Sequence, residues 1–240
     1  MRNPLSKTIT TIQPSGIRKF FDIVHEMKDA ISLGVGEPDF DTPWHIRDEG
    51  IYSLERGRTF YTSNAGLKEL REEICRYLSR RCKVDYTIDE TLITVGGSEA
   101  IDLAMRVLLN PGDEVLTFAP YFGEYRAYVT NYGGILKEVE PNTETFQPNL
   151  KKFEQMLSEK TKAVIVNTPN NPTGVVYSEA TIQKMAAILE TKQKEFGTSI
   201  YLISDEPYRE LAYDGVEVPY LTKYYRNTIV GYSFSKSLSL

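Results

Sequence analysis

A lysine that follows an apolar run is the residue of this chain best suited to covalent chemistry. Lys236 lies in the segment SFSKS, directly after the run 228–232. Partial burial would lower the pKa of its amine toward the range in which the neutral nucleophile exists. A neutral amine can form a Schiff base with a carbonyl compound. A surface lysine at the start of a loop is the alternative interpretation.

An acidic residue follows a second apolar run. Asp205 comes directly after the run 200–204 and could be a buried carboxylate that pairs with a cationic ring nitrogen. Adjacent residues of a strand face opposite sides, so Asp205 and Glu206 are not expected to form a carboxylate pair for acid–base catalysis. A helix or turn cap is the alternative role for Asp205.

Two glycines and a serine open a predicted helix after another extended run. Gly96, Gly97 and Ser98 would leave backbone N–H groups unpaired at the helix N-terminus, where an anion can bind. A tight turn with an N-cap is the simpler interpretation. The sequence contains neither GxGxxG nor GxxxxGK, so dinucleotide and P-loop nucleotide sites are disfavoured.

Polar and aromatic residues follow the other runs. The segment NTPNNPTG, which contains Asn171, has the composition of a turn. Phe122 and Tyr208 would most often be core residues, although each lies where an aromatic ring could contact a planar ligand.

These residues share one place in a predicted architecture of alternating strands and helices. From residue 91 onward, short β-branched runs alternate with stretches of helical periodicity, which is typical of an α/β fold with a mostly parallel sheet flanked by helices. The carboxyl ends of parallel strands meet at one edge of the sheet, where ligands bind. The predicted strands are 91–95, 114–118, 135–139, 163–166, 200–204 and 228–232.

The part of the chain before residue 91 is predicted to be helical. Apolar spacing predicts helices over 15–27 and from residue 67 to the basic run near Lys83. Pro43 is expected at the first position of a further helix that extends to about Leu54. Later in the chain, the residue before the run EATIQKMAAIL is a candidate N-cap.

Composition places the chain among globular proteins. Of its 240 residues, 41% are hydrophobic and 25% are charged, and we interpret residues 1–44 as an N-terminal arm and residues 45–240 as one α/β domain. The net charge of −5 makes nucleic acid a poor candidate partner. No apolar run approaches the ~18 residues that suggest a membrane span, and no apolar signal segment opens the sequence.

The few cysteines and histidines indicate a redox setting and argue against a metal site. Cys75 and Cys82 lie on one predicted helix about 10 Å apart along its axis, beyond the reach of a disulfide. Two free thiols favour a reducing, cytoplasmic location. With only His25 and His45 besides, no metal site is expected.

Five motifs, in this order, resemble those of pyridoxal phosphate (PLP) enzymes of fold type I, specifically the class I/II aminotransferases of the aspartate aminotransferase superfamily. The motifs are GVGEPDFDTP, TVGGSEAI, NTPNNPTG, SDEPY and SFSK. The resemblance covers essentially the whole chain and implies the large domain of fold type I with PLP as cofactor. It also implies transfer of an amino group between an L-amino acid and a 2-oxo acid.

The resemblance implies roles for residues around PLP. Lys236 would form the internal aldimine and would move a proton between the substrate α-carbon and cofactor atom C4′. Asp205 would pair with the protonated pyridine nitrogen and keep the ring an electron sink. Asn171 and Tyr208 would hydrogen-bond the phenolic O3′. Phe122 would stack on the ring, where several family members carry Trp.

Further implied roles concern the phosphate, the substrate and a second subunit. Gly97, Ser98 and Ser233 would bind the phosphate. The backbone N–H of Gly36 would contact the substrate carboxylate. Tyr61 matches a tyrosine that reaches the phosphate of the neighbouring subunit, so a homodimer is expected.

The chain departs from the family pattern at one end. It ends at Leu240, shortly after Lys236, whereas family members continue through a phosphate-binding arginine, a last strand of the large domain and most of the small domain. We therefore expect an incomplete large domain. Two alternatives stay open: a PLP-dependent carbon–sulfur β-lyase, which shares these motifs, and an inactive fragment that merely binds the cofactor.

Overall fold

A five-stranded sheet lies at the centre of the computed structural model, which describes residues 4–12, 29, 31 and 36–240. The strand order is β2-β1-β3-β4-β5, and all neighbouring strands are parallel. This is the sheet type that the sequence predicts. The strands are β1 (Glu114–Phe118), β2 (Ile135–Val139), β3 (Thr161–Asn167), β4 (Tyr201–Asp205) and β5 (Thr228–Gly231).

Five of the six predicted strands are confirmed, and the sixth is wrong. The segment 91–95 belongs to no strand. The backbone N–H of Ile93 donates to the Ala65 carbonyl at 3.0 Å, and helix α5 begins at Gly96. β-branched residues favour extended backbone, but a strand also needs a neighbour that completes its hydrogen-bond ladder. In the described part of the chain, no strand pairs with this segment.

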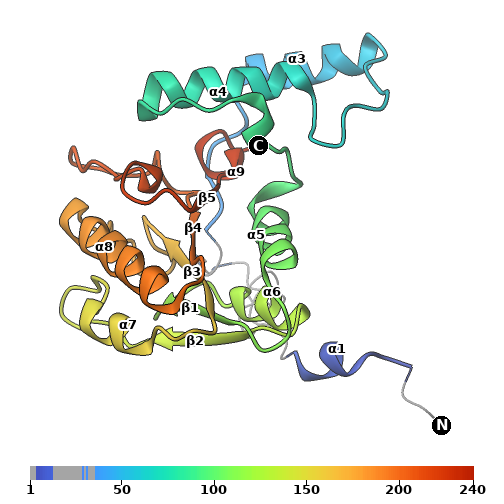
Figure 1. Cartoon of the computed structure of the whole chain (residues 1–240). Helices are drawn as coiled ribbons and strands as arrows, with labels where there is room; N and C mark the ends of the chain where they lie inside the picture. Colours follow the sequence, from blue (N-terminus) through green and yellow to red (C-terminus); the bar gives the residue numbers. More distant parts are fainter. Residues whose placement is uncertain (1–3, 13–28, 30, 32–35) are drawn as a thin grey trace.

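Helices cover both faces of the sheet (Figure 1). Because side chains alternate along a strand, Ile165 of β3 packs with α5 and α6, whereas its neighbour Val164 packs with α7 and α8. The predicted N-cap of α8 is confirmed, since the Ser178 side chain accepts from the N–H of Thr181 at 3.1 Å. The covering helices are α5 (Gly96–Leu108), α6 (Tyr125–Asn131), α7 (Leu150–Met156) and α8 (Glu179–Phe196).

The N-terminal part contributes helices that lie outside these two layers. α3 (Trp44–Glu55) has Pro43 as its N-cap and not as its first residue, a small correction to the prediction. α4 (Lys68–Cys82) confirms the helix predicted from residue 67, and it ends where Lys83 takes the left-handed conformation with φ 57°. The helix predicted over 15–27 lies outside the described residues.

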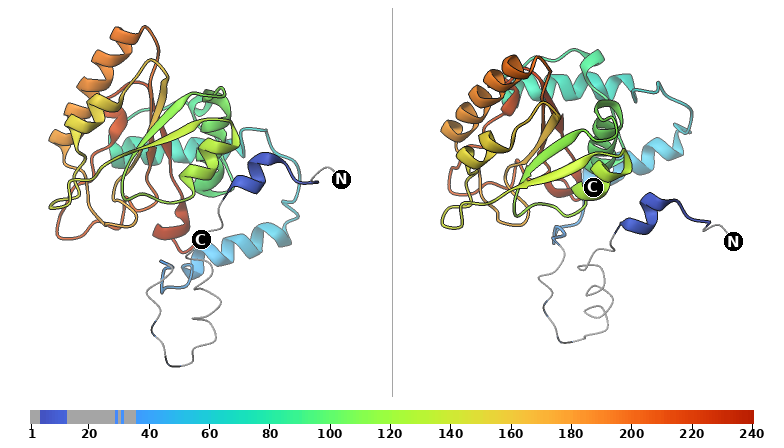
Figure 2. Two further views of the ribbon diagram at one scale, coloured as in Figure 1. Left: turned by 90° about the horizontal axis from the view of Figure 1, so that it is seen from below. Right: turned by 60° about the horizontal axis from the view of Figure 1, so that its bottom comes forward.

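The chain changes its direction across the sheet between β1 and β3. After β1 it adds β2 on one side and then returns to add β3 on the other. In open α/β sheets, ligands bind outside the carboxyl ends of the strands at such a point. The remaining helical segments are α1 (Lys7–Thr11), which projects away from the sheet in Figure 2, η1 (Ile88–Glu90), η2 (Leu221–Lys223) and α9 (Phe234–Ser237).

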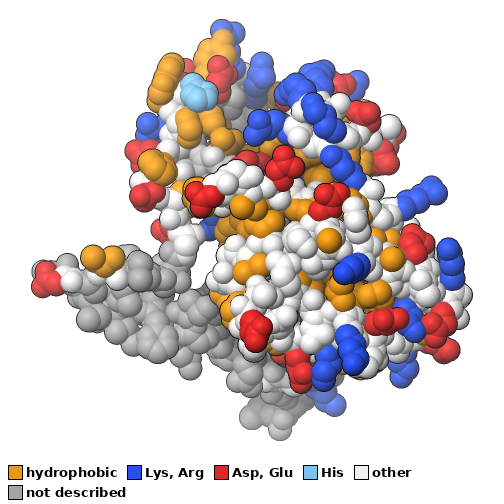
Figure 3. Space-filling view, turned by 90° about the vertical axis from the view of Figure 1, so that its left-hand side faces the viewer, with side chains coloured by type: hydrophobic (Ala, Val, Ile, Leu, Met, Phe, Trp, Pro, Cys, Tyr) orange, Lys and Arg blue, Asp and Glu red, His pale blue; other side chains and the backbone are white. Residues whose placement is uncertain are grey.

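The surface carries charges of both signs. On the face that includes α8, acidic and basic side chains are interspersed with small hydrophobic groups (Figure 3). Both cysteines are free thiols, with Cys82 buried and Cys75 half-buried. Among the helices of the described residues, none combines the length and the apolar character that crossing a bilayer requires.

Candidate active site

The carboxylate at the end of β4 is buried. Asp205 is the last residue of the strand and is 7% exposed. Its Oδ2 accepts a hydrogen bond of 2.5 Å from the Tyr125 hydroxyl on α6. Burial raises the pKa of Asp205 to about 6, and the Tyr125 hydrogen bond acts in the opposite direction. A cationic ligand would therefore stabilise the charged form of this carboxylate.

The neighbouring carboxylate faces other partners, as the alternation of a strand predicts. Glu206 accepts a hydrogen bond from the Ser204 hydroxyl at 2.7 Å and forms an ion pair with Arg209 at 2.5 Å. The Glu206 side chain is 1% exposed, so its charge is balanced within the core. Asp205 and Glu206 therefore do not form a catalytic carboxylate pair.

An amide at the end of β3 links Asp205 to the turn that follows β3. Asn167 lies opposite Asp205 in the strand register. Its Nδ2 donates to the Asp205 carbonyl at 2.8 Å, and its Oδ1 accepts from the backbone N–H of Asn171 at 2.6 Å. The Asn171 amide donates to the Tyr208 hydroxyl at 3.4 Å. Sequence reasoning predicts Asn171 and Tyr208 but misses Asn167, which its place at the end of a strand could have indicated.

Tyr125 is a second residue that sequence reasoning misses. Burial and the neighbouring Asp205 raise the pKa of the Tyr125 hydroxyl well above its ordinary value, so it remains a hydrogen-bond donor at neutral pH. The Phe122 ring packs edge-on against the Tyr125 ring, with centroids 5.7 Å apart. The available signal was the aromatic series Tyr121, Phe122 and Tyr125, which begins three residues after the end of β1.

The N-terminus of α5 faces Asp205. A Cβ atom placed on Gly97 would lie 3.9 Å from Oδ1 of Asp205. The first turn of a helix has unpaired backbone N–H groups, and the Ser98 hydroxyl hydrogen-bonds Tyr128 of α6. The structure thus brings Gly97, one of the predicted anion-binding residues, close to the buried carboxylate.

Lys236 lies on the short helix α9, which follows β5. Its Nζ donates to the backbone carbonyl of Gly36, so the structure brings together two predicted residues from opposite ends of the chain. The lysine is half-buried. Ser233 caps α9, because its side chain accepts from the backbone N–H of Ser235 at 3.2 Å.

One predicted residue is not brought to the site within a single chain. The Tyr61 side chain has a relative exposure of 103%. Phe122, by contrast, is half-buried beside Tyr125. A contact between Tyr61 and a second subunit stays a prediction.

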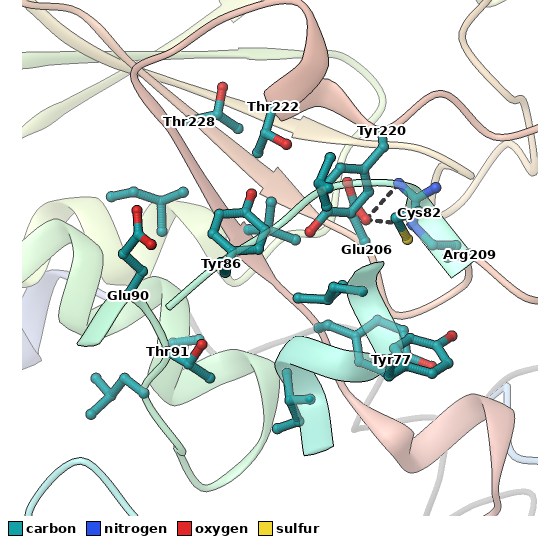
Figure 4. A pocket seen from close by; sticks show the side chains of 18 of the residues that line it. Tyr77, Cys82, Tyr86, Glu90, Thr91, Glu206, Arg209, Tyr220, Thr222 and Thr228 are labelled. Carbon is teal, nitrogen blue, oxygen red and sulfur yellow. Dashed lines mark hydrogen bonds and ion pairs between the residues drawn. The ribbon is translucent and has the colours of Figure 1, made fainter. Parts of the chain in front are cut away.

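A cavity of about 1170 Å³ lies beside the candidate site. α4, the segment 84–94 and β5 line it, and tyrosines and aliphatic residues dominate its wall (Figure 4). The pair Glu206–Arg209 is visible within it. The lining includes Ser233 but neither Lys236 nor Asp205.

Comparison with known proteins identifies the family. Residues 28–240 match the family model described as Aminotransferase class I and II. The chain belongs to this family. The putative aminotransferase YugH of Bacillus subtilis is 43% identical over 244 residues, which cover 100% of this chain and 62% of that protein. The aspartate/prephenate aminotransferase of Thermus thermophilus is 36% identical over 216 residues, which cover 88% of this chain and 54% of that protein.

Solved structures of other aminotransferases share the fold of this chain. A crystal structure of an amino transferase from Eubacterium rectale has a TM-score of 0.92 at 36% identity and matches 100% of this chain and 63% of that one. The structure of aspartate aminotransferase from Thermus thermophilus with maleate has a TM-score of 0.90 at 34% identity. The match covers 99% of this chain and 62% of that one. The chain therefore spans less than two thirds of the length of these relatives.

The donor set of this aminotransferase-family chain fits PLP. The cofactor presents an aldehyde, a phosphate and a pyridine nitrogen. Lys236 offers an amine, the N-terminus of α5 offers N–H groups, and Asp205 offers a buried carboxylate. Within the described residues, no donor other than Tyr125 bonds that carboxylate, which leaves Oδ1 available to a cation.

Proposed function

We propose that the full-length protein is a PLP-dependent aminotransferase that transfers an amino group between an L-amino acid and a 2-oxo acid. The observation that carries the proposal is the hydrogen-bonded group at the carboxyl ends of β3 and β4, with its buried carboxylate Asp205. Membership of the class I and II aminotransferases supports it.

The reaction needs an electron-accepting ring and a group that carries a proton. PLP, when bound, supplies an aldehyde that reacts with amines and a ring that takes up electrons from the substrate α-carbon. Lys236 would hold the cofactor through its amine, and as a free amine it would carry the proton that leaves the substrate α-carbon. Asp205 keeps the ring nitrogen protonated, because a buried carboxylate with a raised pKa gains most from a cationic partner. Asn171 and Tyr208 hydrogen-bond the phenolic oxygen O3′.

Other residues orient the cofactor and the substrate. Gly97 and Ser98 bind the phosphate at the N-terminus of α5, and Ser233 adds a hydroxyl. Phe122 stacks on the ring. The backbone N–H of Gly36 binds the substrate carboxylate, a role that the contact between Gly36 and Lys236 supports.

The proposal extends to the organisation of the protein. Residues 1–44 belong to an arm, and residues 45–240 belong to the PLP-binding domain. Two copies form a homodimer in which Tyr61 reaches the phosphate of the other subunit, and its complete exposure supports a contact made by a partner. The free thiols Cys75 and Cys82 support a cytoplasmic location.

Borohydride reduction tests the covalent role of Lys236. The full-length protein with PLP is expected to be yellow, and reduction should fix the cofactor to the peptide that contains Lys236. The Lys236→Ala variant should show no adduct. A cofactor fixed to another lysine, or an undiminished adduct in the variant, contradicts the assignment.

Product analysis separates the reaction types. Amino transfer to 2-oxoglutarate is expected. Pyruvate, ammonia and sulfide formed from cysteine, or pyruvate, ammonia and homocysteine formed from cystathionine, without amino transfer, would identify a carbon–sulfur β-lyase instead. A reduced adduct without either reaction would indicate a protein that only binds the cofactor.

A further inference from the structure

A chain of hydrogen bonds joins α4 to the helix that carries Lys236. The Tyr77 hydroxyl donates to Oε1 of Glu210 at 2.5 Å, and the Tyr232 hydroxyl donates to Oε2 at 2.8 Å. The hydroxyls of Tyr232 and Ser237 are 2.8 Å apart. We propose that Glu210 is a positioning residue for Lys236, because its carboxylate fixes the orientation of α9 through Tyr232 and Ser237. The inference rests on the proposed function of Lys236.

Counting protons gives the direction of these hydrogen bonds. The Tyr232 hydroxyl has one hydrogen and donates it to Glu210. The Ser237 hydroxyl must therefore donate to the Tyr232 oxygen. All three hydroxyls thus point toward one carboxylate, and a charged acceptor strengthens each bond in such a chain.

The tyrosines remain donors because both stay protonated. Burial, with a contribution from Glu210, raises the pKa of Tyr77 to about 12. Burial is also the largest cause of the raised pKa of Tyr232, and Glu210 adds to it. The direction of the network is therefore constant over the working range of an enzyme near neutral pH.

A helix as short as α9 takes its orientation from its contacts. It spans Phe234–Ser237 and has no buried residue, and a single turn is not stable by itself. The arm holds it through the bond from Lys236 to Gly36 and through the Thr42 hydroxyl, which donates to the Ser239 carbonyl. The Glu210 network adds a separate set of contacts, through Tyr232 and Ser237.

The same network connects the lysine to the ring-binding residues. Glu210 follows Tyr208 by two positions, on the segment that leaves β4 after Asp205. One stretch of chain therefore carries the predicted contacts to the cofactor ring and the anchor of the lysine helix. Displacement by about 1 Å of a reacting group is enough to lower a rate strongly.

Two tyrosine variants form a matched pair. Tyr232→Phe removes the link between Glu210 and α9 and should slow formation of the borohydride-stable Lys236 adduct about 10-fold in the full-length protein. Tyr77→Phe removes the same group from the same carboxylate but leaves the link to α9, so the rate should change less than about 2-fold. Equal slowing in the two variants, or no slowing in Tyr232→Phe, overturns the positioning role.

Variants of the carboxylate complete the test. Glu210→Ala should slow adduct formation as Tyr232→Phe does. Glu210→Gln should retain most of the rate, because an amide can accept from one tyrosine and donate to the other. A Gln variant as slow as the Ala variant contradicts the positioning role.

A Lys236→Ala background separates positioning from a general effect on the pocket. PLP affinity, measured there by fluorescence titration, should be the same with and without Tyr232→Phe, since the network acts through the lysine. If Tyr232→Phe lowers PLP affinity in the Lys236→Ala background, its effect is on the pocket as a whole, and the inference is overturned. Failure of the unmodified full-length protein to form any adduct overturns the proposed function itself, whereas a normal adduct unaffected by these variants overturns only the role of Glu210.

Discussion

The two halves of the candidate site are held in place by different means. Asp205 and Asn167 lie at the ends of adjacent parallel strands, and hydrogen bonds from Asn167 join Asp205 to Asn171 in the turn after β3. Lys236 lies beyond the edge strand β5, on a short helix that contacts Gly36 and is joined to Glu210 through the hydroxyls of Tyr232 and Ser237. The sheet itself positions the half that we propose to bind the cofactor ring, whereas contacts from distant elements position the half that contains Lys236.

This difference predicts which changes damage binding, stability or reaction. Changes at the strand ends should disturb the hydrogen-bonded group there and therefore affect both the stability of the fold and the binding of the cofactor. Changes around α9 should act on the lysine alone. The largest effect on turnover is expected at Asp205, whose charge we propose to act on the cofactor ring.

Asp205→Ala is expected to retain the fold and to lower turnover by about 10²–10³-fold in the full-length protein, because a preorganised charge opposite the ring nitrogen is lost. Steady-state kinetics and circular dichroism measure the two properties. Asp205→Asn is the matched control for shape, and it should be impaired as well. Near-normal turnover in either variant would show that the carboxylate charge does not act on the ring.

Asn167→Ala should lower the free energy of unfolding by about 2–4 kcal/mol, because it leaves the buried Asp205 carbonyl and the half-buried N–H of Asn171 without their hydrogen bonds. It should also weaken PLP binding, since it frees the backbone of Asn171. Asn149→Ala removes the N-cap of α7 and should cost about 1 kcal/mol without any effect on the cofactor. Denaturant unfolding and PLP titration compare the two variants. Unchanged PLP binding in Asn167→Ala would show that the hydrogen bonds of Asn167 do not position the cofactor site.

Stability without the cofactor should depend on pH through Asp205. Its pKa rises from 3.8 to about 6 on folding, so between these values the folded protein holds a proton that the unfolded chain has lost. Stability should therefore fall as pH rises from about 4 to 6, by on the order of 2–3 kcal/mol from this group. The contribution of Asp205 is isolated by subtracting the curve of stability against pH that is measured for Asp205→Asn. A difference that is flat with pH, or of opposite sign, would mean that Asp205 is not destabilised by burial.

The predictable part of the site is the part that the sheet positions. Asp205 and Asn171 could be predicted because each follows an apolar run, and parallel strands bring their ends together. Asn167 and Tyr125 were missed because their roles depend on the strand register and on the packing of α6 against the sheet. The contact between Tyr77 and Glu210 spans 133 positions, and no local pattern indicates it.

The fold shows the same limit. The five strands were predictable from short apolar and β-branched runs, and their ends were nearly correct. The segment 91–95 has the same composition but no paired neighbour in the described residues, so it forms no strand. Composition reports the preference of a segment, whereas pairing depends on the rest of the molecule.

The most direct test is to titrate the Lys236→Ala variant of the full-length protein with PLP. It asks whether the residues positioned by the sheet hold the cofactor without the lysine. Saturable binding without a borohydride-stable adduct is the predicted result, because Asp205, Asn171, Tyr208 and the N-terminus of α5 remain in place. Complete loss of PLP binding in this variant, with its fold intact, would contradict the account.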